Sequence, residues 1–166
     1  MTTLRVFSMV AVLGLMVVAP AWSAGHVAPL VIPSAAFHND GDDPEGFWFH
    51  PDGYLEGEGA GVKMIAAVYL PSYATVESFT LYAVDGTDSC PIPSVNAWLY
   101  RVEISNGDVS MMALTATSGA SSAMQERVDS SIAYPVVSNL QYRYFVRVDF
   151  CASTHDFYSI AIDYSE

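Results

Sequence analysis

Apolar and polar residues alternate along several segments of the chain, most clearly near its carboxyl end. In LQYRYFVRVDF, residues 140–150, every second residue from Leu140 to Phe150 is apolar, and the positions between them include Arg143, Arg147 and Asp149. A period of two is typical of a β-strand with one buried face. The last such segment, residues 156–164, has its expected buried face at Tyr158, Ile160, Ile162 and Tyr164.

Four earlier segments have strand-like composition and are separated by turn residues. They cover residues 62–70, 75–84, 95–104 and 108–117, and Asn106-Gly107 predicts a hairpin turn between the last two. Within residues 95–104, alternation predicts a core face that contains Trp98 and Tyr100. We expect an all-β, single-domain antiparallel β-sandwich of jelly-roll type with eight or nine strands; an up-and-down or Greek-key barrel is the alternative.

The amino terminus predicts an export signal. Arg5 precedes the apolar run Val6 to Val18, which is too short to span a bilayer, and Pro20 follows it. Small residues at positions 21 and 23 favour cleavage before Ala24, and cleavage after Ala21 is the second choice. We therefore predict a signal peptide over residues 1–23, an extended arm or first strand over 24–37 and the sandwich domain over 38–166. The mature chain is expected outside the cytosol, secreted or periplasmic, with no membrane span.

The net charge limits the kinds of partner that the chain can bind, and its cysteines bear on whether it contains a disulfide. Eighteen acidic against six basic residues give a formal net charge of −12, which repels nucleic acid and excludes it as a partner. Cys90 and Cys151, in an exported chain, predict a disulfide, with two free thiols as the alternative.

The segment HNDGDDPEGFWFHPDGYLEGEG, residues 38–59, concentrates acids, glycines and aromatics. Carboxylate and backbone oxygens are the ligands of calcium, so Asp40, Asp42, Asp43 and Glu45 form a candidate calcium site, although their spacing does not fit an EF-hand. A solvated acidic loop is the simpler interpretation.

Aromatic side chains in the same segment suggest a second kind of site. Trp48 and Tyr54 beside Asp52 could bind a glycan, because ring faces pack on pyranoses and carboxylates accept hydroxyl hydrogen bonds. The alternative places Phe47 and Phe49 in the core and Trp48 over a sheet edge.

The sequence contains none of the catalytic motifs that were considered. It has no G-x-S-x-G elbow, no H-E-x-x-H motif and no phosphate-binding glycine loop, and single histidines such as His50 and His155 are expected to be exposed and unliganded. We therefore expect no catalytic residues and no enzyme activity.

Several segments together resemble a group of exported bacterial proteins of unassigned function. They are AVYLPSYATVESFTLYAVD, VNAWLYRVEISNGDVSMMALTATSGASS, YPVVSNLQYRYFVRVDF and FYSIAIDYS, and the resemblance extends from about Ala35 to Tyr164. It implies a secreted β-sandwich domain and assigns no functional residue.

Two functions remain open. The first is a secreted, non-catalytic binding or structural module of the bacterial cell exterior, which predicts self-association or attachment to the cell envelope. The arm 24–37 could complete a neighbour's sheet in such an assembly, but pairing with its own sheet is the favoured outcome. The second is a calcium-assisted carbohydrate-binding module that recognises cell-surface glycans through residues 40–58.

Overall fold

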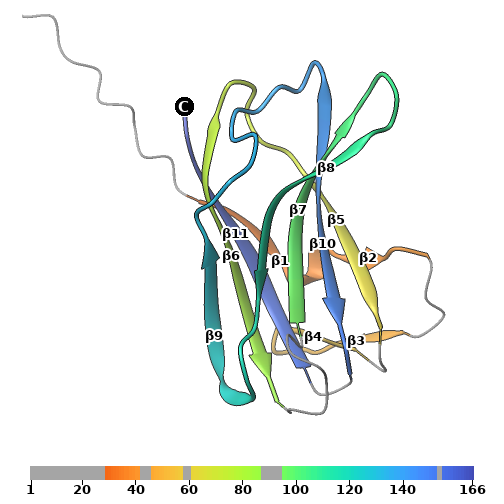
Figure 1. Cartoon of the computed structure of the whole chain (residues 1–166). Helices are drawn as coiled ribbons and strands as arrows, with labels where there is room; N and C mark the ends of the chain where they lie inside the picture. The colour runs from red at the N-terminus through yellow and green to blue at the C-terminus, as the bar shows by residue number, and fades with distance from the viewer. Residues whose placement is uncertain (1–28, 42–45, 58–60, 87–94, 153–154) are drawn as a thin grey trace, which may run out of the picture.

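The computed structural model describes residues 29–41, 46–57, 61–86, 95–152 and 155–166, and it forms a sandwich of two antiparallel sheets (Figure 1). Its elements are β1 (Leu30–Pro33), the short 3-10 helix η1 (Ser34–Ala36), β2 (His38–Asn39), β3 (Phe47–Phe49), β4 (Leu55–Gly57), β5 (Lys63–Val68), β6 (Thr75–Asp85), β7 (Val95–Glu103), β8 (Val109–Ala116), β9 (Ser121–Asp129), β10 (Tyr142–Phe150) and β11 (His155–Ser165). The all-β prediction is confirmed, and two separate sheets make the fold a sandwich and not a closed barrel.

One sheet has six strands in the order β3-β4-β11-β6-β9, and β1 also pairs with β11, farther along that strand than β4. The other has five strands in the order β2-β5-β10-β7-β8. The described part of the amino-terminal arm thus completes its own sheet through β1. The predicted signal peptide, residues 1–23, lies outside the described residues. Among those that are described, no helix has the length and apolar character needed to cross a membrane.

The core lies between the two sheets and is made from alternate residues of the long strands. Phe79, Leu81, Leu99, Val146 and Phe157 are fully buried there. In β10 the predicted faces are confirmed, because Tyr144, Val146, Val148 and Phe150 point inward while Arg143 stays exposed. Burial of a large aliphatic or aromatic side chain contributes roughly 1.5–3 kcal/mol, so these alternating positions hold the sheets together.

The core face predicted for residues 95–104 is wrong. Val95, Ala97 and Leu99 are completely buried, and the intervening Trp98 and Tyr100 lie on the outer face of the five-stranded sheet. Both faces of β7 carry apolar side chains, so alternation defines two faces without showing which one is inside.

A β-bulge changes the predicted face of β11. The register of β11 against β6 shifts between Phe157 and Ser159, so Phe157 and Ile160 both point into the core. Tyr158 therefore lies on the outer face, contrary to the prediction, while Ile160 and Ile162 are buried as expected. A bulge inserts one residue and reverses the facing of those beyond it.

The strand β9 has no counterpart among the predicted segments. It pairs with β6 at the edge of the six-stranded sheet, and its residues are mostly exposed on both faces. A strand without a buried face carries no alternation for the sequence to reveal.

Candidate functional site

The hairpin β3–β4 carries one face of exposed and half-buried polar and aromatic side chains. Trp48 of β3 is opposite Glu56 of β4, and Glu56 is in turn opposite Asp156 of β11. Neighbouring residues of the same strands, Leu55 and Phe157, pair with each other and are fully buried. Because successive side chains of a strand point to opposite faces, Trp48, Glu56 and Asp156 share the outer face of the six-stranded sheet.

A tight turn brings two more rings to this face. His50 N–H donates to the Tyr54 carbonyl at 2.9 Å and Gly53 N–H donates to the His50 carbonyl at 2.9 Å. Gly53 adopts a φ of 89°, which favours glycine. The Ser34 hydroxyl also donates to the Gly53 carbonyl at 2.8 Å, which ties the turn to η1.

The side chains beyond the turn form a continuous cluster. The His50 imidazole stacks on the Tyr54 ring, with centroids 4.3 Å apart and planes 11° apart, and its Nε2 lies 2.9 Å from Oε2 of Glu56. Tyr54 in turn contacts Tyr158 at a centroid distance of 5.4 Å. We call Trp48, His50, Tyr54, Glu56, Asp156 and Tyr158 the hairpin cluster.

The charges in the hairpin cluster are unbalanced. Partial burial and the neighbouring Glu56 carboxylate raise the pKa of Asp156, while His50 and His155 lower it by less. Partial burial, together with the carboxylates of Asp156 and Glu56, also raises the pKa of Tyr54. At neutral pH the Tyr54 phenol stays protonated and can donate a hydrogen bond to a ligand, and the neighbouring carboxylates of Glu56 and Asp156 can accept hydrogen bonds from it.

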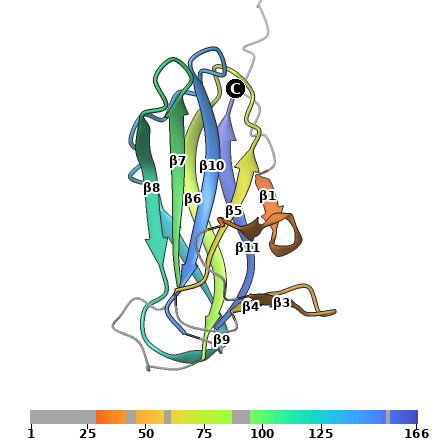
Figure 2. The same cartoon turned by 90° about the vertical axis from the view of Figure 1, so that its right-hand side faces the viewer.

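The aromatic part of the hairpin cluster is accessible. Trp48 is 62% exposed, and Figure 2 shows β3 and β4 projecting from the body of the sandwich, at the end opposite the carboxyl terminus. Phe49, on the other face of β3, is also exposed, while Phe47 packs partly against the core. The prediction that both phenylalanines lie in the core is therefore correct for Phe47, in part, and wrong for Phe49.

The predicted glycan residues are thus close together, whereas the calcium residues are mostly undescribed. Asp52 is exposed in the turn that joins Trp48 to Tyr54. Asp42, Asp43 and Glu45 lie outside the described residues, while Asp40 lies beside the five-stranded sheet, where its N–H bonds the Lys63 carbonyl at 3.1 Å. In the described part of the chain no three His, Cys, Asp or Glu side chains gather as a metal site would need. The calcium site stays a prediction.

The outer face of the five-stranded sheet carries a second group of rings. Phe145 stacks with Tyr100, its partner in register, at 5.1 Å, and the Arg147 guanidinium lies 5.4 Å from the Trp98 ring. Arg147 also donates to the Asp149 carboxylate at 2.6 Å. Arg147 and Asp149 thus bind each other on this face, and the rings of Trp98, Tyr100 and Phe145 surround them.

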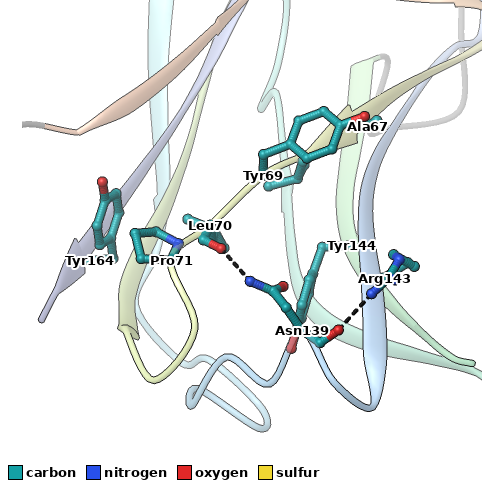
Figure 3. A pocket seen from close by; sticks show the side chains of 9 residues that line it. Ala67, Tyr69, Leu70, Pro71, Asn139, Arg143, Tyr144 and Tyr164 are labelled. Atoms are coloured by element: carbon teal, nitrogen blue, oxygen red, sulfur yellow. Dashed lines mark hydrogen bonds between the residues drawn. The ribbon is translucent and has the colours of Figure 1, made fainter.

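A pocket of about 690 Å³ lies near the carboxyl terminus, lined by Tyr69, Leu70, Pro71, Arg143 and Tyr164 among others. Figure 3 shows its polar groups bonded to one another: Asn139 Nδ2 donates to the Leu70 carbonyl at 2.7 Å, and Arg143 donates to the Asn139 carbonyl at 2.6 Å. These bonds hold the loops together and leave a mainly apolar lining.

A buried polar network at the other end of the sandwich is structural. His155 and Asp85 are 0% and 1% exposed, and their Nδ1 and Oδ1 atoms lie 3.3 Å apart. The Thr117 hydroxyl donates to Asp85 at 2.8 Å, and Cys151 Sγ lies 3.7 Å from His155. The expectation that His155 is exposed is therefore wrong, because a pairing with the end of β6 buries it. Buried histidine needs such a partner.

Only one of the two cysteines of the predicted disulfide, Cys151, belongs to the described residues. Cys151 lies directly after β10 and is not a free thiol. Cys90 lies outside the described residues, so its pairing with Cys151 stays a prediction.

The sequence predicted two members of the hairpin cluster, Trp48 and Tyr54, together with Asp52 in the adjoining turn, but not the other four members. His50 and Glu56 could have been inferred, because Pro51-Asp52-Gly53 is a turn signal that folds them onto one face. Asp156 and Tyr158 follow about a hundred residues later, and only the β4–β11 pairing and the bulge bring them there.

Comparison with known proteins identifies similar folds but assigns the chain to no family. No family model matches the sequence, and no curated protein matches it. Among solved structures, the CBM36-1 domain of a multidomain xylanase from the hindgut metagenome of Trinervitermes trinervoides superposes with a TM-score of 0.52 at 14% identity, covering 81% of this chain and 96% of that one.

Two further solved structures are family 6 carbohydrate-binding modules. The carboxyl-terminal module of the marine laminarinase LamC from Zobellia galactanivorans has a TM-score of 0.52 at 7% identity, over 82% of this chain and 99% of the module. CsCBM6-3 from Clostridium stercorarium, solved with cellobiose, has a TM-score of 0.50 at 9% identity, over 81% and 92%. At these identities the similarity concerns the fold alone: the chain is a β-sandwich resembling the jelly rolls of carbohydrate-binding modules.

Proposed function

We propose that this chain is an exported, non-catalytic carbohydrate-binding module whose binding site is the hairpin cluster. The observation that carries the proposal is the outer-face surface in which an exposed Trp48 and the half-buried rings of Tyr54 and Tyr158 adjoin the half-buried carboxylates of Glu56 and Asp156. Aromatic faces pack on the apolar side of a pyranose, and carboxylates accept hydrogen bonds from its hydroxyls.

The fold supports this proposal over a purely structural role. The three solved structures compared above are carbohydrate-binding modules, although a shared fold does not by itself assign a function. Assembly by exchange of the amino-terminal arm has less support, because β1 already pairs with β11 of the same chain. Export rests on the amino-terminal sequence, with its single Arg5 before an apolar run.

Binding can be tested by isothermal titration calorimetry of the chain from Ala24 to Glu166 with soluble xylan, laminarin and cello-oligosaccharides. We expect saturable binding of at least one glycan and no release of reducing ends. Trp48→Ala is expected to weaken it about tenfold, since loss of one stacked ring removes roughly 1.4 kcal/mol.

Tyr69→Ala is the matched control for Trp48→Ala. Tyr69 is 86% exposed and lines the pocket near the carboxyl terminus, away from the hairpin cluster, so its loss should leave binding unchanged. Equal weakening by both substitutions, or no binding across a broad glycan array, would contradict the proposal. Repeating the titration with calcium and then with a chelator tests whether Asp40, Asp42, Asp43 and Glu45 add a cation requirement.

A further inference from the structure

Two carboxylates face each other at the centre of the hairpin cluster. Glu56 and Asp156 are direct partners on β4 and β11, and side chains so paired have their Cβ atoms about 4.5–5.5 Å apart. Like charges at that separation repel each other. Both side chains are only half-buried, so a ligand can reach them.

The charge of this pair is poorly compensated by the protein. Glu56 is bonded to the His50 imidazole, and the two groups that lower the pKa of Asp156 are His50 and His155. Burial lowers the pKa of His155, so its ring is neutral near pH 7. The lysine and arginines of the described residues belong elsewhere: Lys63, Arg101, Arg143 and Arg147 to the five-stranded sheet, and Arg127 to the edge strand β9.

Aromatic rings border the carboxylates in two directions, across the strands and along them. Trp48 lies opposite Glu56 across the β3–β4 pair, and Tyr158 lies two residues after Asp156 along β11, in contact with Tyr54. A ring face attracts an ammonium group as well as the apolar face of a sugar. The same few side chains can therefore hold a pyranose and a positive charge attached to it.

We infer that the hairpin cluster selects glycans that carry a primary ammonium group, such as β-linked glucosamine, over neutral and anionic glycans. This inference rests on the proposed function, because it specifies the ligand of the same site. The ammonium group lies between Glu56 and Asp156, where it relieves their repulsion, while the rings hold the sugar. Uronic acids are repelled by the same pair.

Three oligosaccharides with the same β-1,4-linked pyranose backbone test the selectivity directly. Oligomers of equal length of glucosamine, N-acetylglucosamine and glucose differ mainly in the group at C2, so differences in affinity report on that group. Titrations at mildly acidic pH, where the amine is protonated, are expected to show the glucosamine oligomer binding on the order of tenfold more tightly, with a preference that falls as salt is added.

Substitutions that remove charge but keep shape locate the preference. Glu56→Gln and Asp156→Asn should each reduce the preference to about twofold or less while binding of the glucose oligomer persists. Glu77→Gln removes the same charge from an exposed position of β6 and should leave the preference intact. A preference that survives Glu56→Gln and Asp156→Asn, or that falls equally with Glu77→Gln, overturns the inference.

The remaining outcomes separate this inference from the proposed function. If all three oligomers bind alike and Trp48→Ala weakens their binding by about tenfold, the inference is overturned and carbohydrate binding stands. If no oligomer and no other glycan binds, both fail. Spermidine is the last control: if it competes as effectively as the glucosamine oligomer, the inference is overturned, because the sugar ring would then add nothing.

Discussion

Replacing Asp156 with asparagine is expected to stabilise the fold at neutral pH. The substitution removes one charge from the pair with Glu56 and keeps the side chain nearly the same shape. Like charges directly opposite each other in a sheet cost about 0.2–1 kcal/mol, and water screens this pair toward the lower end because both carboxyls are only half-buried. The expected gain corresponds to an increase of roughly 1–3 °C in Tm.

The pH dependence of this gain follows from the raised pKa of Asp156, which burial and then Glu56 cause. An acid whose pKa is higher in the folded than in the unfolded state binds its proton more tightly in the fold, so its ionisation opposes folding. The penalty is present above the folded pKa and vanishes below the ordinary value of 3.8. Asp156→Asn should therefore stabilise the protein at pH 7 and have little effect at about pH 3.

Urea unfolding followed by tryptophan fluorescence measures the effect, with a double-mutant cycle as the decisive step. In a Glu56→Gln background the gain from Asp156→Asn should shrink, because the repelling charge is already gone. Asp163→Asn is the matched control on the same strand: the Asp163 carboxylate accepts a hydrogen bond from the Ser78 hydroxyl at 2.6 Å, so replacing this charged acceptor by a neutral one should weaken the bond and destabilise the fold. A destabilised Asp156→Asn at pH 7, or an equal gain in both backgrounds, would refute the reasoning.

Three further predictions concern the scaffold. Leu99→Ala empties a fully buried position on β7 and should lower the free energy of unfolding by about 2–5 kcal/mol in urea titrations; a loss below 1 kcal/mol would contradict the assigned core. Gly53→Ala places a Cβ at a φ of 89° and should lower the free energy of unfolding by about 1 kcal/mol. It should also weaken glycan binding, because the strained turn displaces Tyr54. An unchanged Tm and an unchanged affinity would contradict the assigned turn. Burial lowers the pKa of His155 below its ordinary value of 6.5, so protonation favours the unfolded chain and the free energy of unfolding should fall as the pH decreases below 6.5. Unfolding curves of His155→Gln measured over the same pH values should lack this fall. An identical pH dependence in both proteins would assign the fall to other groups.

The fold class and part of the candidate site could be predicted from the amino-acid sequence alone. Alternation in residues 140–150 placed Val146 and Val148 inside because the positions between them include charged residues that cannot be buried without partners. The stretch from Trp48 to Tyr54 was recognisable because its members are adjacent along the chain, joined by a turn whose residues signal it.

Which faces are buried, and which distant residues meet, could not be predicted without the packed fold. Trp98 and Tyr100 lie outside because β7 is apolar on both faces, and its orientation depends on what packs against it. A bulge turned Tyr158 outward, and the pairing of β4 with β11 placed Asp156 against Glu56. Alternation is a property of one strand, whereas register between strands a hundred residues apart is set by the packing of the whole sheet.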